Sequence, residues 1–556
     1  MVEGMLPRYL SFPTLFLQKL KLAGIFPVAL ALLLALPVIV IVSYTFSGSF
    51  SLWQHLWHSV LTDYVTNSLL LMLGVSFGVL LLGVPSAWLT SACDFPCRRI
   101  LSWALLMPLA FPAYIIAYTY TGMLDAAGPV QTWLRQFMGW QYGDYWFFNI
   151  RSLGGAVVML SLVLYPYVYL LARAAFLGQS ATIIDAAKVS GHGSYSTFFK
   201  LTLPMARPAI ITGLTLALME TLADYGTVGY FGVSTFTTGI FRTFYGFGDT
   251  AAAAQLSAVL LGFVVSLIFI ERYSRKQARY HATKGSHAPL IRLKGRHALF
   301  ASLFCLLPLL LGFIVPALQL FYWAIFESVI SNNFARLAWN SFYLSLSAAG
   351  IAVVLALMLA YSKRIYSRQK IVSAAVSMTG LGYAVPGTII AIGVIIPFAW
   401  LDTRLIAFFE HQFNINIGLL LSGTLAALLF AYTVRFLAVS LGAIESGLEQ
   451  VKPNLDNAAR LMGYKPFQVL REIHLPLIKG SILTAFLIVF VDVLKELPAT
   501  LILRPFNFNT LAVRAYELAS DERLIDAAPA SLLIVLVGLL PVILLSRSIA
   551  VSNRQK

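Results

Sequence analysis

Long apolar runs separated by short polar segments dominate the chain from residue 24 onward. A helix needs about 20 mostly apolar residues to cross a bilayer, and the runs reach that length repeatedly. The pattern predicts twelve transmembrane helices and therefore an all-α polytopic membrane protein. The expected spans lie near residues 24–46, 66–91, 100–122, 151–175, 208–231 and 251–271, and then near 299–328, 340–362, 372–400, 417–441, 480–503 and 526–546.

The composition agrees with this pattern. Of the 556 residues, 59% are hydrophobic and only 11% are charged, against about 25% charged in a typical soluble domain. The mean hydropathy is +0.81, so lipid must be the solvent for much of the chain. No small-residue cleavage site follows the first apolar run, 26–42, and we interpret that run as a retained helix.

The formal net charge of +16 is concentrated in short loops. On a soluble protein such a charge would suggest nucleic acid, but no basic and aromatic surface domain is present, so no nucleic-acid partner is expected. The segment 271–298 carries eight Lys or Arg residues and one acid, whereas the stretch 47–64 carries neither Lys nor Arg. Since Lys and Arg mark cytoplasmic loops, twelve spans place both termini in the cytoplasm.

An internal repeat divides the chain into two halves. Residues 185–204 and 457–476 align at an offset of 272 positions, and the same offset aligns the segments that begin at Glu220 and Asp492. An even number of spans separates the copies, so the two six-helix repeats should be parallel. The expected organisation is a first half over 1–271, a basic cytoplasmic linker over 272–298 and a second half over 299–556.

Each repeated segment is too polar to span and should form a short cytoplasmic helix. Small residues permit close approach, a glycine ends the helix or turns the chain, and a Leu-Pro opens the next span. The residues concerned are Asp185, Ala186, Ala187 and Gly191 in the first copy and Asn457, Ala458, Ala459 and Gly463 in the second.

These two segments resemble the EAA loops of bacterial binding-protein-dependent ABC importer permeases, here with both halves fused in one chain. Both copies depart from the family pattern at the first position, where Asp185 and Asn457 replace glutamate. The resemblance implies a type I importer permease in the inner membrane. It also implies that the loops dock on two copies of an ATPase subunit. The chain has no phosphate-binding GxxxxGK[ST] loop, so ATP and Mg²⁺ are expected on those subunits, with no cofactor on this chain and no enzymatic activity of its own.

Carboxylates recur inside the predicted membrane segments. Glu220 and Asp224 are four residues apart, which predicts a shared helix face, and Asp492 and Glu496 repeat the spacing. Lys495 adjoins the second pair and Tyr225 the first. Ionisable residues at such depth are candidates for function. The six residues indicate either a translocation path, with transient Fe³⁺ binding by the four carboxylates, or polar contacts between helices and helix ends that reach water.

The stretches 222–246 and 493–517 resemble permeases of the ferric-iron uptake group, most specifically in the run KELPATLILRPF. This resemblance implies a cargo of ferric iron, a periplasmic iron-binding protein as a partner besides the ATPase and membrane lipid, and alternating access driven by ATP. The outer loops near 232–250 and 504–525 would meet the binding protein, with Arg504 and Arg514 either docking its acidic surface or serving as ordinary surface charges.

Two alternatives remain at this point. One is the same class of importer with thiamine or an organophosphonate as cargo. The other is an ion-gradient secondary transporter, which would also have two six-span halves but no use for the duplicated loops. His192 and His474 lie within those loops and are interpreted as solvated residues, because no second metal ligand lies beside either of them.

Overall fold

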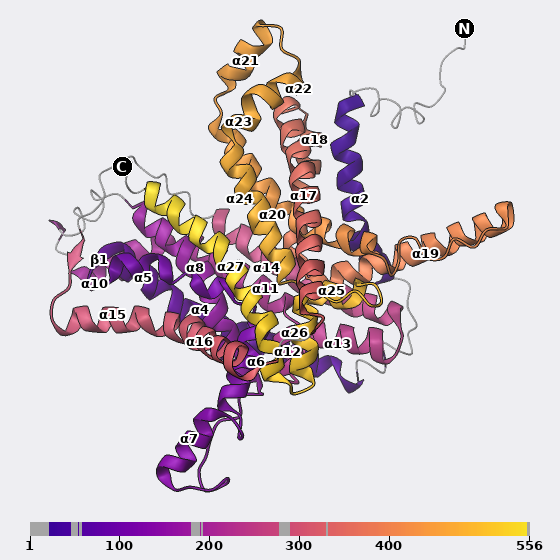
Figure 1. Cartoon of the computed structure of the whole chain (residues 1–556). Coiled ribbons are helices and arrows are strands. Elements are labelled where there is room, and N and C mark those ends of the chain that lie inside the picture. The colour runs from indigo at the N-terminus through magenta and orange to yellow at the C-terminus, as the bar shows by residue number, and fades with distance from the viewer. Residues whose placement is uncertain are drawn as a thin grey trace, which may run out of the picture.

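The computed structural model describes residues 22–45, 54, 58–179, 189–190, 193–276, 290–329, 332–367 and 369–552. The described chain is almost entirely helical (Figure 1). A helix pairs its interior backbone N–H and C=O groups with each other by hydrogen bonds. This pairing is required in a membrane, because lipid tails offer no hydrogen-bond partners. The described strands are β1 (Cys93–Asp94) and β2 (Ile291–Arg292), which pair in parallel and join the linker to the first half.

The first half begins with α2 and ends with α14. Its described helices are α2 (Leu22–Tyr44), α4 (Leu61–Ala92), α5 (Arg98–Ala104), η1 (Met107–Ala110), α6 (Ala113–Leu124), α7 (Pro129–Met138), α8 (Leu153–Leu177), α10 (Ser194–Thr197), η2 (Phe198–Thr202), α11 (Leu203–Ala223), α12 (Gly226–Tyr230), α13 (Phe236–Phe241), η3 (Arg242–Gly246) and α14 (Thr250–Lys276).

The second half repeats this order with different interruptions. Its described helices are α15 (Arg296–Leu309), η4 (Leu310–Ile314), α16 (Val315–Tyr322), η5 (Trp323–Glu327), α17 (Phe334–Ile365), α18 (Lys370–Thr379), η6 (Gly382–Ala384), α19 (Gly387–Phe413), α20 (Leu425–Gln450), α21 (Pro453–Leu461), α22 (Pro466–Val469), η7 (Leu470–His474), α23 (Leu475–Leu477), α24 (Lys479–Leu494), α25 (Pro498–Leu503), α26 (Leu511–Ser520) and α27 (Leu524–Ser552).

The expectation of about twelve spans is confirmed, but two of the spans are bent helix pairs and not single helices. Ten helices of the described chain are long and apolar enough to cross a membrane, and two bent helix pairs raise the number to twelve. The first pair, Arg98–Ala110 with Ala113–Met138, bends by 91°. It breaks where Phe111 is extended before Pro112, because a residue that precedes proline is driven out of the helical region. The second pair, Pro466–Leu477 with Lys479–Leu494, bends by 77°.

The two halves interlock. Helix α2 of the first half packs on α18 and α19 of the second, while α15, η4 and α16 of the second half pack on α4, α6 and α8 of the first. Gly393 permits the first of these contacts, because a β-carbon there would collide with the Pro37 carbonyl oxygen. The halves therefore share one core although they are separate in sequence.

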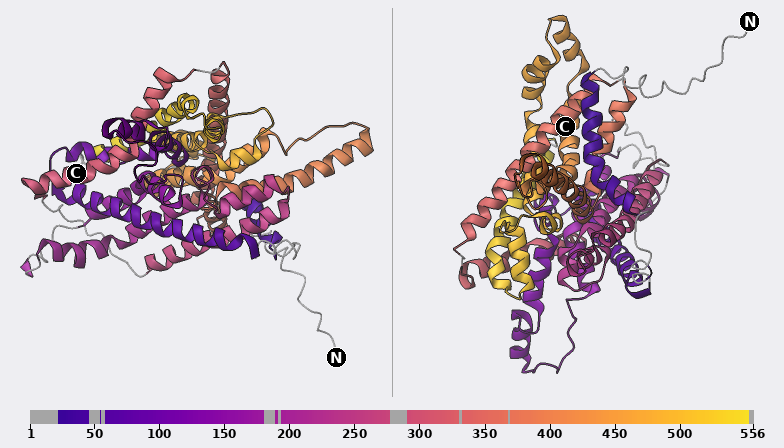
Figure 2. Two further views of the ribbon diagram at one scale, coloured as in Figure 1. Left: turned by 90° about the horizontal axis from the view of Figure 1, so that it is seen from below. Right: turned by 90° about the vertical axis from the view of Figure 1, so that its right-hand side faces the viewer.

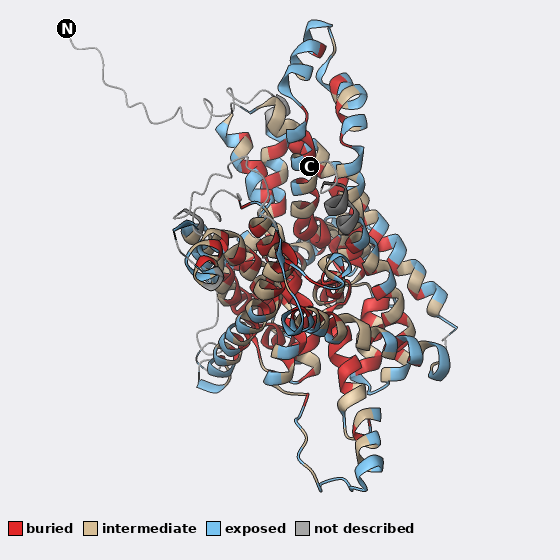
Figure 3. Ribbon diagram, turned by 90° about the vertical axis from the view of Figure 1, so that its left-hand side faces the viewer, coloured by how far each residue is buried: buried red, intermediate tan, exposed pale blue. Residues whose placement is uncertain are grey.

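The second coupling segment (residues 453–477) lies at one end of the molecule. In Figure 1 and in the right-hand view of Figure 2, α21 is at the top and α7 at the bottom. Buried residues gather in the centre of the bundle, whereas both of these ends are largely exposed (Figure 3). Large apolar side chains along the spans are also exposed, such as Phe77 at 70% and Phe269 at 70%, as expected of surfaces that face lipid.

Candidate functional site

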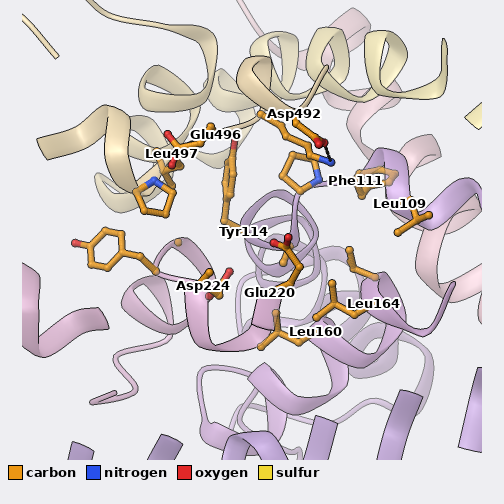
Figure 4. A pocket seen from close by; sticks show the side chains of 18 of the residues that line it. Leu109, Phe111, Tyr114, Leu160, Leu164, Glu220, Asp224, Asp492, Glu496 and Leu497 are labelled. Atoms are coloured by element: carbon orange, nitrogen blue, oxygen red, sulfur yellow. Dashed lines mark ion pairs between the residues drawn. The ribbon is translucent and has the colours of Figure 1, made fainter. Parts of the chain in front are cut away.

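A cavity of about 120 Å³ lies where the two halves meet, and all six residues predicted for the path line it. Figure 4 shows the carboxylates of Glu220 and Asp224 facing those of Asp492 and Glu496, with Tyr114 between them. The lining residues used below are Tyr114, Tyr167, Glu220, Asp224, Tyr225, Tyr383, Arg435, Asp492, Lys495 and Glu496.

The first carboxylate pair does not share a helix face, contrary to the prediction from spacing. Helix α11 ends at Ala223, and Asp224 has an extended backbone. The Asp224 Oδ2 accepts the backbone N–H groups of Thr227 and Val228, both at 3.0 Å, and Oδ1 accepts the Thr227 hydroxyl at 2.9 Å. The carboxylate thus satisfies free N–H groups in the first turn of α12, where the helix dipole favours negative charge.

The second pair departs from the prediction in the same way. Helix α24 ends at Leu494, two residues before Glu496. The Glu496 Oε1 accepts the Ala499 N–H at 2.9 Å, and Oε2 accepts the N–H and hydroxyl of Thr500 at 3.0 and 2.6 Å. Glu496 therefore binds the first turn of α25 as Asp224 binds that of α12. This common geometry explains the four-residue spacing.

Two cations lie among the carboxylates. Lys495 pairs with Asp492, with Nζ 2.8 Å from Oδ1. Arg435 of α20 lies between the halves, 3.2 Å from Glu496 Oε1 and 4.0 Å from Glu220 Oε2. Sequence reasoning missed Arg435, although it is the only charged residue between Leu425 and Leu441, and an intramembrane charge of this kind is a functional candidate.

Three further phenols line the cavity and were also missed. The Tyr114 side chain is 5% exposed, and its hydroxyl has no hydrogen-bond partner among the described residues. Tyr167 of α8 and Tyr383 of η6 line the cavity together with Glu220 and Asp492, and both phenols lie within electrostatic range of these two carboxylates. Tyr225 was predicted to lie here, and its ring stacks on Phe241 with centroids 3.6 Å apart.

The cavity has an acidic character. Four carboxylates against two cations leave two excess negative charges when all are ionised. Within the described ranges, no three side chains of His, Cys, Asp or Glu are close enough together to hold a metal ion. The carboxylates therefore surround a shared space without forming a closed metal cage.

The first coupling segment lies largely outside the described residues, including Asp185, Ala186, Ala187, Gly191 and His192. The second forms α21, on which Asn457 and Ala458 are exposed and Ala459 is buried. Gly463 has a φ angle of +84°. Its N–H donates a hydrogen bond to the Arg460 carbonyl oxygen at 3.1 Å, and the Tyr464 N–H donates one to the Ala459 carbonyl oxygen at 3.0 Å. These two bonds end the helix in a Schellman motif.

The tip of this segment exposes apolar side chains, and a partly buried polar network lies at its base. Leu461 is 90% exposed and Phe467 is 70% exposed. Asp456 at the base accepts hydrogen bonds from Arg364 at 2.8 Å and pairs with His474 at 2.6 Å. Burial opposes ionisation of Asp456, yet the hydrogen bonds from Arg364 and His474 hold its pKa below the usual range.

Two further interpretations change in the structure. His474 is not a solvated loop residue: it is 1% exposed, because the chain folds back and brings it to Asp456. Arg504 and Arg514 both pair with Glu517, at 2.9 and 3.6 Å, so part of their charge is already balanced within the chain.

Known proteins match this chain along most of its length. The family described as binding-protein-dependent transport system inner membrane component matches residues 11–279 and 352–555. An Fe(3+)-transport system permease protein of Haemophilus influenzae is 26% identical over 500 residues, covering 88% of this chain and 90% of the relative. A ferric transport system permease protein of Actinobacillus pleuropneumoniae is 25% identical over 445 residues, covering 75% and 61%. A molybdenum transport system permease protein of Escherichia coli is 26% identical over 232 residues, covering 40% and 96%.

Proposed function

Because the chain belongs to the family of binding-protein-dependent transport system inner membrane components, and is thus a multi-pass permease of an ABC importer, we propose that its cargo is ferric iron. A periplasmic binding protein would deliver the iron, and the permease would release it into the cytoplasm. The relative with the greatest coverage among those described above is named for Fe(3+) transport, which supports this cargo over the others.

The single observation that carries the proposal is the charge of the cavity. Four carboxylates and several phenols surround a space that both halves line, with two cations among them. Hard cations favour oxygen ligands of this kind. An oxyanion such as molybdate or sulfate, or an organophosphonate, would meet a lining with excess negative charge, and like charges repel.

The energy would come from two ATPase subunits that bind ATP and Mg²⁺ and dock on the two coupling segments. On the second segment, Leu461, Met462 and Phe467 are exposed apolar side chains suited to a groove on such a partner. Closure of the ATPase pair would draw the coupling segments together and open the cavity outward, and hydrolysis would reset it inward. This arrangement has both chain termini in the cytoplasm.

The test is uptake of radiolabelled ferric iron into liposomes that contain the permease, its ATPase and its binding protein. We expect uptake only with ATP. Glu220→Gln and Asp492→Asn should each reduce it at least about tenfold, because each removes a charge that would meet the ion. Glu410→Gln, at an exposed carboxylate of α19, is the matched control and should leave uptake unchanged.

Three outcomes separate the alternatives. Loss of uptake in both cavity variants at normal complex assembly supports the cargo and the path. Iron uptake that survives both changes keeps the cargo and removes the path. Absence of iron uptake, with ATPase activity stimulated by a binding protein loaded with thiamine or a phosphonate, assigns the permease to that cargo.

A further inference from the structure

The four carboxylates of the cavity are not equally free to bind an ion. Both oxygens of Asp224 and both of Glu496 accept hydrogen bonds from the turns that follow them. Glu220 and Asp492 form ion pairs instead, Glu220 with Arg435 at 4.0 Å and Asp492 with Lys495 at 2.8 Å. These two carboxylates, one from each half, have oxygen capacity left. Two carboxylates alone are too few for a trivalent ion, which needs more hard oxygen donors.

Tyr167 and Tyr383 supply oxygen donors at the same place. One belongs to each half, and both line the cavity with Glu220 and Asp492. Each phenol interacts with both Glu220 and Asp492. Both residues are partly exposed, and both belong to the cavity lining. Two carboxylates and two phenols are thus gathered where the halves meet.

A third phenol of the cavity has a hydroxyl that no described side chain or backbone group engages. Tyr114 lines the same cavity and is only 5% exposed. Its hydroxyl has no hydrogen-bond partner among the described residues. Burying a hydroxyl without a hydrogen bond costs about 1–3 kcal/mol, so the Tyr114 hydroxyl is an available polar group in the wall of the cavity.

We propose that ferric iron is coordinated in transit by the phenolate oxygens of Tyr167 and Tyr383 together with the carboxylates of Glu220 and Asp492. This inference rests on the proposed cargo. As each Fe–O bond forms, the phenol O–H bond breaks and its proton passes to water in the cavity, so the two phenols release two protons. No electron is transferred, and the iron remains Fe³⁺. Metal ligands must be deprotonated in this way, and protons are released on binding.

The neighbouring cations complete the mechanism. Without an ion, Lys495 and Arg435 balance Asp492 and Glu220; with an ion, the carboxylates exchange these partners for the metal. Two phenolates and two carboxylates carry four negative charges, one more than Fe³⁺ neutralises. Lys495 and Arg435 remain in the cavity lining and offset this excess charge. Phenolate ligation should favour Fe³⁺ over Mg²⁺ and Ca²⁺, because a higher ionic charge displaces phenol protons more effectively.

The test is the visible absorption of the complete transporter in nanodiscs with ferric nitrilotriacetate as the probe. Phenolate bound to Fe³⁺ gives a charge-transfer band that carboxylate ligation does not. We expect the band in the natural protein, a weaker band in Tyr167→Phe or Tyr383→Phe, and none in the double variant. Iron affinity of the double variant should fall by at least about tenfold, the loss seen even for outer-shell partners of metal ligands.

Tyr343→Phe is the matched control, because it removes a phenol of α17 that is 47% exposed and does not line the cavity; it should keep the band. A band that persists in the double variant, or a natural protein that imports iron without showing a band, overturns the phenolate site and leaves the ferric cargo intact. A natural protein that shows neither band nor ATP-dependent iron uptake overturns both. Melting temperatures of all variants should match within a few degrees, which separates ligand loss from misfolding.

Discussion

The two halves place a carboxylate at the same point of the fold but surround it differently. Asp224 and Glu496 each accept two backbone N–H groups and a hydroxyl from the helix turn that follows. Glu496 is also bonded to Arg435, whereas no Lys, Arg or His of the described chain forms an ion pair with Asp224. The positions that correspond to Arg435 and Lys495 in the first half are Val163 and Ala223.

This difference shows which part of the duplicated design is structural. The bonds from carboxylate to helix turn are present in both halves, so they belong to the shared fold. The cations occur only in the second half, and Arg435 reaches across the interface toward Glu220. The second half therefore balances charge for both halves, and the first half leaves Glu220 dependent on a partner 4.0 Å away.

The largest effect should come from removing the charge of Glu496. Glu496→Gln leaves Arg435 buried without its close partner, which typically destabilises by about 3–5 kcal/mol. Asp224→Asn breaks no ion pair, and an amide oxygen can still accept hydrogen bonds from N–H groups. This variant should therefore lose about 1 kcal/mol or less of its free energy of unfolding. Unfolding of the two variants in mixed detergent micelles measures the difference.

The double variant Arg435→Gln with Glu496→Gln serves as the control. It removes the close ion pair as a whole and should recover part of the stability that Glu496→Gln loses, because the buried Arg435 charge is gone and only Glu220, whose side chain is 26% exposed, loses its more distant partner. Equal losses for Glu496→Gln and Asp224→Asn would contradict the asymmetry between the halves.

A second comparison concerns the coupling segments. The second is held by Asp456, Arg364 and His474, whereas Thr202 occupies the position that corresponds to His474 in the first half. Asp456→Asn should destabilise the second segment by about 1.5–3 kcal/mol, because hydrogen bonds to a charged group are lost. Hydrogen exchange in α21 should rise, and ATPase stimulation by the loaded binding protein should fall. Glu472→Gln, at an exposed carboxylate of the same segment, should change neither.

The pH dependence of this network has a defined sign. The pKa of Asp456 is lowered in the folded protein, so its stabilisation is fully present above the unfolded value of about 4. The stabilisation is lost as pH falls from there through the folded pKa. Protection of α21 should therefore weaken below about pH 4 in the natural protein and show less pH dependence in Asp456→Asn. An identical acid response in both proteins would exclude Asp456 as its source.

The sequence predicted the fold better than the site. Apolar runs locate spans because lipid demands about 20 apolar residues, and the repeat located both carboxylate pairs. The four-residue spacing of Glu220 and Asp224 predicted a shared helix face, and this prediction is wrong. The helix ends between them, and Asp224 binds the turn that follows. Partners of Arg435 and the meeting of Tyr167 with Tyr383 depend on how the halves pack, which no local pattern encodes.

A smaller effect than that of Glu496→Gln or Asp456→Asn should come from the turn that ends α21. Gly463 has φ +84°, and a β-carbon there would meet nothing within 4 Å. Gly463→Ala should therefore destabilise the segment by about 1–2 kcal/mol through backbone strain alone. Gly442 within α20 also has open space around it, and Gly442→Ala should stabilise by about 0.5–1 kcal/mol because it lies inside a helix. Hydrogen exchange should thus become faster in α21 of Gly463→Ala and slower in α20 of Gly442→Ala, and slower exchange in α21 of Gly463→Ala would contradict the role assigned to the positive φ of Gly463.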